Sequence, residues 1–366
     1  MRDPLRRRSS RPLLLAVPTR AAALSRASTR SWPALILLGL ILLAAIIVLA
    51  TAAPPIDATA VLIRDVGLVE RLRYDGPFYQ LAADTLRSGG ESLRPALAFP
   101  LPGLPVIVAG LPPIVAVAMM IGLAAVVAMA WQVRLARLCG GTAGQIALLV
   151  LLIAGLVPAG QPDLTAVPET WAGLLIALSL ACRRPGRWIE AAGFGLAAAL
   201  MTGVAALYLL IMTALAWREG HAREAAGWSG TLLILVVVLA FHLHGVAGVL
   251  HPLDAVGTLA GGAGWSAGFA TVAGTTAAIL LPFPVGAMLV MLAAIGWTAW
   301  RDPLAIRAGA MIVAILVTLA TGMPAMGGLL VAPIALVGLV FVPDLLRDLV
   351  AAAFDNRRIT VRRSVR

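Results

Sequence analysis

Residues 33–52 read PALILLGLILLAAIIVLATA and contain no charged side chain. A run of roughly 20 apolar residues is the length that an α-helix needs to cross about 30 Å of hydrocarbon. Such runs recur along the whole chain of 366 residues, which is 61% hydrophobic and 12% charged. Soluble domains carry about 25% charged residues. A soluble core could not hide this much apolar surface, so the sequence predicts an all-α, polytopic transmembrane helical bundle.

The apolar runs predict about ten spans. They lie at 33–52, 113–133, 142–157, 169–182, 188–201, 203–217, 227–244, 274–299, 306–321 and 326–345. Ala50-Thr51-Ala52 fits a signal-peptidase site, but a signal peptide has a shorter apolar core of about 7–15 residues, so we expect an uncleaved signal-anchor. The apolar stretch 96–110 contains three prolines. It falls short of a full crossing and is predicted to be juxtamembrane or re-entrant, protected by neighbouring protein.

Arginine positions decide the predicted topology. All 28 basic residues are arginine, and 23 of them lie in segments that are cytoplasmic if the amino terminus is inside. The other five lie in the first external loop, 53–112, and are Arg64, Arg71, Arg73, Arg87 and Arg94. Treating 96–110 as a span would move most of the later arginines outside, against the positive-inside rule. Ten spans with both termini cytoplasmic are therefore expected.

The same charges suggest the domain organisation. Residues 1–31 carry eight arginines among Ser, Pro and Ala, and we expect a disordered basic cytoplasmic tail that lies against anionic membrane lipids. A transmembrane domain is expected over 32–346 and a second basic cytoplasmic tail over 347–366. The net charge of +11 is spread over short clusters rather than one continuous face, so no nucleic-acid partner is expected. No protein partner is evident either.

The first external loop, 53–112, differs from the other predicted external loops because it holds both acids and arginines, whereas the others hold no arginine. Its stretch 65–73, DVGLVERLR, places Val66, Val69 and Leu72 on one helical face, which suits a helix lying in the membrane interface. A second helix is predicted to start after Asp75 and to end near 88–90, where glycine is a common stop signal. Lesser external loops are expected at 158–168 and 245–273.

The motif that carries most functional information is 74–82, YDGPFYQLA, followed by Leu86 and Gly89. An Asp, a Tyr four residues later and a glycine that closes the helix resemble the first external loop of GT-C membrane glycosyltransferases. The closer resemblance is to bacterial relatives of the polyprenyl-phosphate mannosyl- and aminoarabinosyltransferases. The proline-containing stretch 98–102 and the arginine-rich turn 183–188 resemble later parts of that pattern, which covers most of the chain.

The resemblance implies a GT-C-like fold in a bacterial inner (plasma) membrane. It also implies sugar transfer from a polyprenyl-phosphate-linked donor to an envelope glycan or lipid acceptor at the external face. Asp75 would match the catalytic carboxylate, acting as general base on the acceptor hydroxyl or holding a metal. A carboxylate beside apolar surface can have its pKa raised into a useful range. The alternative is that Asp75, before Gly76-Pro77, only caps a helix.

Five further residues are candidate substrate ligands. Tyr79 lies one helical turn beyond Asp75, but it could equally be an interfacial aromatic anchor. Arg73 and Arg94 could hold the phosphate leaving group, or they could be solvated loop charges or lipid-headgroup contacts. Asp163 and Glu169 flank the start of the fourth predicted span, where the family also carries acids. They could bind the acceptor or a metal, with helix capping as the alternative.

The sequence leaves the cofactor unknown and two other functions open. A divalent metal ion is compatible with the acids, but the spacing of His242, His244 and His251 makes no convincing ligand set. Relatives often carry charged residues where this chain has Met201-Thr202-Gly203-Val204, and again at Thr321-Gly322-Met323-Pro324. The alternatives are therefore a non-catalytic GT-C-like protein that binds a lipid-linked sugar, and a membrane transporter. A transporter usually keeps ionisable residues near the bilayer midplane, which the predicted spans lack.

Overall fold

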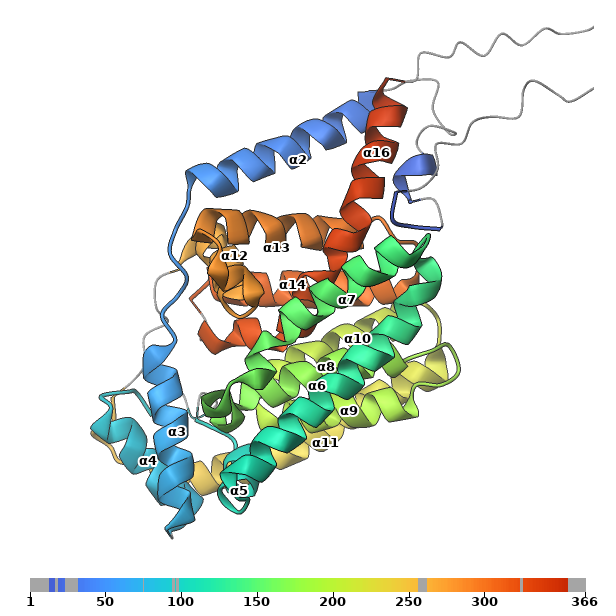
Figure 1. Cartoon of the computed structure of the whole chain (residues 1–366). Helices are drawn as coiled ribbons and strands as arrows, with labels where there is room; N and C mark the ends of the chain where they lie inside the picture. The colour runs from blue at the N-terminus through green and yellow to red at the C-terminus, as the bar shows by residue number, and fades with distance from the viewer. Residues whose placement is uncertain are drawn as a thin grey trace, which may run out of the picture.

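The computed structural model describes residues 13–16, 19–23, 32–74, 76–93, 96, 99–255, 262–322 and 325–354. Across these ranges the chain forms helices and turns, and the β-type pairings are isolated bridges, Leu15 with Cys139 and Arg184 with Arg187. Figure 1 shows the helices packed into one bundle, with a smaller helical group at its lower left. The all-α fold class is confirmed for this part of the chain.

Five of the described helices are long and apolar enough to cross a bilayer. They are α2 (Trp32–Ala50), α6 (Pro113–Leu135) continued by η3 (Ala136–Leu138), α7 (Thr142–Leu156) continued by η4 (Val157–Gly160), α11 (Ala222–Ala247) and α14 (Pro303–Ala320). Shorter apolar helices complete the bundle: α8 (Pro168–Cys182), α9 (Ile189–Met201), α10 (Ala206–Arg218) and α13 (Phe283–Trp297). Long apolar helices satisfy every backbone hydrogen bond internally, which is what hydrocarbon requires. The chain is a helical membrane protein.

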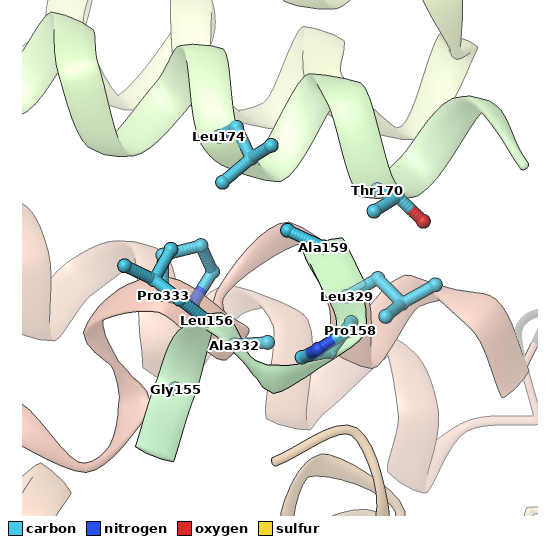
Figure 2. Close-up of a pocket in the computed structure, with 9 residues that line it drawn as sticks. All are labelled: Gly155, Leu156, Pro158, Ala159, Thr170, Leu174, Leu329, Ala332 and Pro333. Carbon is cyan, nitrogen blue, oxygen red and sulfur yellow. The ribbon is translucent and has the colours of Figure 1, made fainter. Parts of the chain in front are cut away.

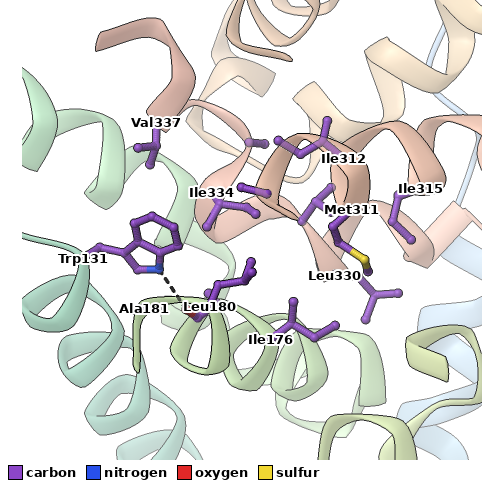
Figure 3. Close-up of a cluster of buried hydrophobic side chains, with 14 of the residues drawn as sticks. Trp131, Ile176, Leu180, Ala181, Met311, Ile312, Ile315, Leu330, Ile334 and Val337 are labelled. Carbon is purple, nitrogen blue, oxygen red and sulfur yellow. Dashed lines mark hydrogen bonds between the residues drawn. The ribbon is translucent and has the colours of Figure 1, made fainter. Parts of the chain in front are cut away.

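The centre of the bundle lies where α6, α8 and α14 meet. The indole of Trp131 on α6 is fully buried, and its Nε1–H donates to the carbonyl of Ala177 on α8 at 2.9 Å. Figure 3 shows this tryptophan beside Leu180 of α8, with Met311 and Ile312 of α14 closing the other side. Because the bond satisfies the indole's only donor, the ring can be buried without cost. The helix α8 is therefore enclosed on nearly all sides.

Two predicted spans are wrong as continuous helices. The stretch 274–299 contains the end of α12 (Gly264–Gly274), the short helix η7 (Ala277–Leu280) and then α13. Pro282 precedes α13 and lacks the N–H that would extend a helix through this point. The stretch 326–345 is also divided. It contains η8 (Ala325–Leu330), α15 (Ala332–Ala335), η9 (Val337–Phe341) and the start of α16 (Val342–Ala353).

Close backbone packing accompanies the second interruption. A Cβ atom on Gly296 of α13 would collide with the carbonyl oxygen of Gly338 in η9, and one on Gly338 would collide with the carbonyl of Ala293. The two segments therefore approach each other backbone to backbone, which only glycine permits. A regular helix through 326–345 would not present its backbone in this way.

The first long loop, 53–112, contains three helices: α3 (Thr59–Arg73), α4 (Phe78–Ser88) and α5 (Gly103–Ala109). The helix expected at 65–73 starts six residues earlier, at Thr59. The second helix ends at Gly89, as the glycine signal predicts. The seven residues of α5 are too few to cross a bilayer. This agrees with the expectation for 96–110.

The ordered structure extends into both predicted tails. The helix α16 continues to Ala353, beyond the expected boundary at 346, because Leu349, Ala352 and Ala353 are buried against the bundle. Within the stretch expected to be disordered, the backbone N–H groups of Leu13, Leu14 and Leu15 donate to the carboxylate of Asp344 at 2.8–2.9 Å. A second bond at 2.7 Å joins Thr19 to Asp348. The arginines beyond these ranges lie outside the described residues.

Connecting segments gather at two ends of the bundle. At one end, which we call the loop end, α3 packs on α5 and on η5 (Pro162–Ala166). Arg87 of α4 pairs there with Asp254 at 3.0 Å, and this guanidinium holds the pKa of Asp254 at about 2. All three predicted external loops thus lie together. Figure 1 shows this end at the lower left.

At the opposite end, the turn end, four buried or half-buried charges link separate helices. Arg183, which ends α8, makes two bonds to Glu224 at 2.9 and 2.8 Å. Arg307 of α14 makes two bonds to Glu219 at 2.8 and 2.7 Å, and these bonds hold the pKa of Glu219 below its usual range. All four residues come from segments predicted to be cytoplasmic.

Candidate functional site

A buried carboxylate lies at the loop end, on the face of α3 that packs against the bundle. Asp65 is 5% exposed and shares this face with Leu68 and Val69, three and four residues further along. The guanidinium of Arg64 contacts its Oδ1 atom at 2.8 and 2.9 Å. The same arginine reaches Glu91, beyond the end of α4, at 2.9 Å. One cation therefore holds two carboxylates from different parts of the loop.

A third carboxylate enters from the transmembrane bundle. Glu169 lies in the first turn of α8, and its Oε1 atom accepts a hydrogen bond from the hydroxyl of Thr202 at 2.8 Å. Thr202 ends α9 and is 7% exposed. The negative charge of Glu169 is close enough to act on Asp65. We call Arg64, Asp65, Glu91, Glu169 and Thr202 the loop-end carboxylate cluster.

Burial is the largest influence on Asp65 and raises its pKa from 3.8 to about 6. The charges of Glu169 and Glu91 act in the same direction, while Arg64 opposes them. Desolvation disfavours the charged form of a carboxyl group, and neighbouring negative charges do so as well. The cluster therefore contains a carboxyl group that can exchange a proton near neutral pH, which is the property that general acid–base chemistry requires.

The pKa of Asp65 predicts a pH dependence of stability. Between pH 3.8 and about 6 the folded chain keeps a proton that the unfolded chain releases, so the free energy of unfolding falls as pH rises through this window. The loss amounts to about 3 kcal/mol. Asparagine does not titrate, so Asp65→Asn should not show this fall in the free energy of unfolding. The difference in unfolding free energy between the variant and wild type should therefore shift in favour of the variant from pH 4 to pH 7. Denaturation in detergent at each pH measures the difference.

A control comes from the same loop. Asp84 on α4 is largely exposed, and Asp84→Asn should follow the wild-type pH profile. If Asp65→Asn and wild type gave parallel profiles across this range, the raised pKa of Asp65 would be wrong.

The predicted ligand Tyr79 lies in a second group, an aromatic cluster between α4 and α11. Its hydroxyl is 3.3 Å from Nδ1 of His242, and its ring lies within 6.3 Å of the ring of Phe99. A Cβ atom on Gly245 would collide with the Tyr79 ring at 2.5 Å, so glycine is needed there. Burial raises the pKa of the Tyr79 phenol. Tyr79 is half-buried within this cluster.

The remaining predicted site residues are dispersed. Arg73 is exposed at the end of α3, and Asp163 is exposed in η5. Asp75 and Arg94 lie outside the described residues. The described helix α4 begins with Pro77 at its N-cap position. Of the four predicted residues that the structure describes, Glu169 alone belongs to the loop-end carboxylate cluster.

The cluster contains residues that the sequence did not single out. Asp65 and Glu91 lie in the predicted first external loop but were not among the predicted site residues. A usable signal was present: an Asp three and four residues before Leu68 and Val69 belongs to their apolar face, where an acid is unusual unless it is paired. Thr202 carries no such signal, because a hydroxyl at a helix end is common.

A small cavity lies between α8, η4 (Val157–Gly160), η8 and α15. Figure 2 shows Thr170 and Leu174 of α8 facing Pro158, Leu329 and other residues across it. The lining is apolar apart from the Thr170 hydroxyl, which has no hydrogen-bond partner among the described residues. A buried hydroxyl without a partner is costly.

The described residues contain no group of three His, Cys, Asp or Glu side chains suited to a metal ion. His242 contacts Tyr79 in the aromatic cluster, and the backbone N–H of His251 donates to Asp254 in the following loop. The acids of the loop-end carboxylate cluster are already paired with Arg64 and Thr202. This arrangement suits proton transfer and hydrogen bonding to hydroxyl groups.

The fold and site together define a helical membrane protein with a paired, partly protonatable carboxylate cluster at one end of its bundle. A comparison of this chain with protein-family models, curated proteins and solved structures gives no match. The functional argument therefore stands on the residues themselves.

Proposed function

We infer that the chain is a GT-C-type membrane glycosyltransferase that moves a sugar from a polyprenyl-phosphate donor to an envelope glycan or lipid acceptor. In this proposal ten segments cross the bacterial inner membrane, both termini are cytoplasmic, and the loop end faces outward. The grouping of the predicted external loops at one end, and of the arginine-rich turns at the other, supports this topology.

The observation that carries the proposed chemistry is the buried Asp65 carboxyl group, held by Arg64 and with its pKa raised by burial and by the negative charge of Glu169. The two acids come from different segments, one in the first long loop and one at the start of α8. A buried carboxyl group under the influence of another negative charge costs free energy, and such groups are common at functional sites. Carboxylates, an arginine and a threonine hydroxyl are the groups that bind sugar hydroxyls and phosphate.

The proposed reaction needs one proton acceptor. The oxygen of the acceptor hydroxyl forms a bond to the anomeric carbon while the bond from that carbon to the donor phosphate breaks. The electron pair of the broken bond stays on the phosphate oxygen, and the hydroxyl proton moves to a carboxylate. The resemblance assigns this role to Asp75, which joins α3 to α4. Glu169 and Thr202 would hold sugar hydroxyl groups, and Arg73 and Arg94 are the proposed partners of the phosphate.

Removal of the proton acceptor tests this proposal. Asp75→Asn keeps the size of the side chain but removes the base, and loss of general-base catalysis typically costs a factor of about 10²–10⁴. We expect a deletion strain that produces Asp75→Asn to show the envelope glycans of the deletion strain itself, at unchanged membrane expression. Glu169→Gln should reduce glycan modification less severely, because it retains a hydrogen-bond acceptor.

The matched control is Asp84→Asn, which removes an exposed acid from α4 and should leave the glycans unchanged. Full glycan modification by Asp75→Asn would refute the catalytic assignment. If the deletion strain itself showed wild-type glycans but the protein drove uptake of a labelled solute into vesicles, the transporter alternative would replace this proposal.

A further inference from the structure

The turn end of the bundle contains a pocket that the proposed sugar transfer does not use. It encloses about 440 Å³, part of it open to solvent. Its lining residues are Leu15, Thr19, Leu138, Ala299, Trp300, Arg301 and Phe341. They come from the N-terminal segment, the turn between α6 and α7, the end of α13, and η9. The pocket therefore lies where a bundle helix, α13, reaches its end.

The floor of the pocket is aromatic. Trp300 is stacked on Phe341, with ring centroids 5.8 Å apart and an interplanar angle of 15°. Trp297 packs against the same phenylalanine, with ring centroids 5.5 Å apart. Leu15 and Leu138 add aliphatic walls. A floor of this kind offers apolar area to a hydrocarbon chain, but it offers nothing to a small, fully hydrated anion.

The roof of the pocket is fixed by backbone bonds. The N–H of Ala16 donates to the carbonyl of Leu138 at 2.6 Å, and the N–H of Arg20 donates to the carbonyl of Ala299 at 2.8 Å. The buried carboxylates of Asp344 and Asp348 accept from the same N-terminal segment and also pair with Arg347. These bonds fix Leu15 and Thr19, which line the pocket, against the bundle.

The rim of the pocket is positively charged. The side chains of Arg20 and Arg301 are exposed, and neither makes an ion pair within the described part of the chain. The neighbouring acid, Asp302, caps α14 by accepting from the N–H of Leu304 at 2.8 Å, and it lies 4.0 Å from Arg134. Arg301 lines the pocket, and the backbone of Arg20 is bonded to the lining residue Ala299, so both guanidinium groups are placed to meet an incoming anion.

We propose that this pocket binds an anionic membrane lipid, with an acyl chain against Trp300 and Phe341 and the headgroup phosphate beside Arg20 and Arg301. Aromatic residues and arginines at helix ends are the groups that meet lipid headgroups. The apolar floor selects a lipid over free phosphate, and the basic rim selects an anionic headgroup over a zwitterionic one. This site is independent of the sugar chemistry at the loop end.

Fluorescence quenching tests the proposal on the full chain in phosphatidylcholine nanodiscs. A minor fraction of phosphatidylglycerol with brominated acyl chains is added, and the contribution of Trp300 is taken as the difference between wild type and Trp300→Phe. Two arginines near an anionic surface favour an anionic lipid by on the order of 30-fold. We therefore expect brominated phosphatidylglycerol to quench Trp300 at roughly 10- to 30-fold lower mole fraction than brominated phosphatidylcholine does.

Arginine substitutions distinguish the effect of Arg20 and Arg301 on lipid preference from the effect of general surface charge. Arg20→Gln with Arg301→Gln should remove the preference for phosphatidylglycerol. Arg187→Gln, which removes an exposed arginine from another turn at the same end, should keep it. Equal quenching by the two brominated lipids, or an equal loss in Arg187→Gln, would overturn the proposal. Relief of quenching by inorganic phosphate at millimolar concentration would also overturn it, because the site would then select free phosphate.

Discussion

Glu224→Gln is expected to destabilise the folded protein by about 3–5 kcal/mol. Arg183 and Glu224 are each 3% exposed, and the two bonds between them join the end of α8 to the start of α11. Removal of Glu224 leaves the buried Arg183 with only a longer contact to Glu219 at 3.5 Å, and a buried charge that loses its main partner costs far more than the intact pair contributes. Glu219 replaces the lost partner only in part, because its carboxylate is also bound by Arg307 at 2.8 and 2.7 Å.

The measurement is the denaturation midpoint in detergent, together with the amount of folded protein in the membrane. Glu190→Gln is the matched control, because Glu190 is exposed in the first turn of α9, and it should behave as wild type. The double variant Arg183→Met with Glu224→Met removes both charges and should be more stable than Glu224→Gln alone. A Glu224→Gln protein with wild-type stability would show that the buried pair does not hold these helices together.

The helices that sequence reasoning predicted best are those with uniform apolar runs bounded by proline, glycine or arginine. The helix α7 (Thr142–Leu156) matches the predicted range 142–157 almost residue for residue, and α6 starts at the predicted Pro113. Such runs can form only helices in a bilayer. Composition does not distinguish α8 from α2, however, although α8 is buried on nearly all sides and α2 is mostly exposed. Both are apolar all round, so only packing separates them.

The sequence did not predict that the helices in 274–299 and 326–345 are interrupted, because tertiary contacts determine where they break. The approach of Gly296 to Gly338 brings together two glycines that lie 42 positions apart in the chain. Either glycine alone is compatible with a transmembrane helix, where glycine is common. No local pattern indicates that the second segment must turn its backbone toward the first. The sequence predicted two continuous spans for this reason.

The candidate site was predicted in part. Glu169 was chosen because an acid at a membrane edge needs a partner, and the structure provides Thr202. Asp65 was missed because the apolar face of α3 was placed through Val66, Val69 and Leu72. The buried face of α3 instead includes Asp65 and Leu68. It is rotated from the predicted face by about the angle between successive residues of a helix. Pairing with Arg64 makes this burial possible, and pairing cannot be recognised from spacing alone.

An all-or-none difference in thiol labelling is expected between the two ends of the bundle. A reporter chain would carry Cys139→Ala and Cys182→Ala, which remove both native cysteines. Ser88→Cys then places one thiol on the exposed end of α4, and Arg187→Cys places one in the exposed turn after α8. A charged maleimide does not cross the inner membrane, because transfer of a charged group through hydrocarbon is costly.

This labelling tests the central claim, that the loop-end carboxylate cluster lies on the outer side of the membrane. The account predicts that intact cells label Ser88→Cys fully and leave Arg187→Cys unlabelled until the inner membrane is permeabilised. The opposite pattern, or labelling of both sites in intact cells, would contradict the claim and with it the proposed transfer of an external lipid-linked sugar.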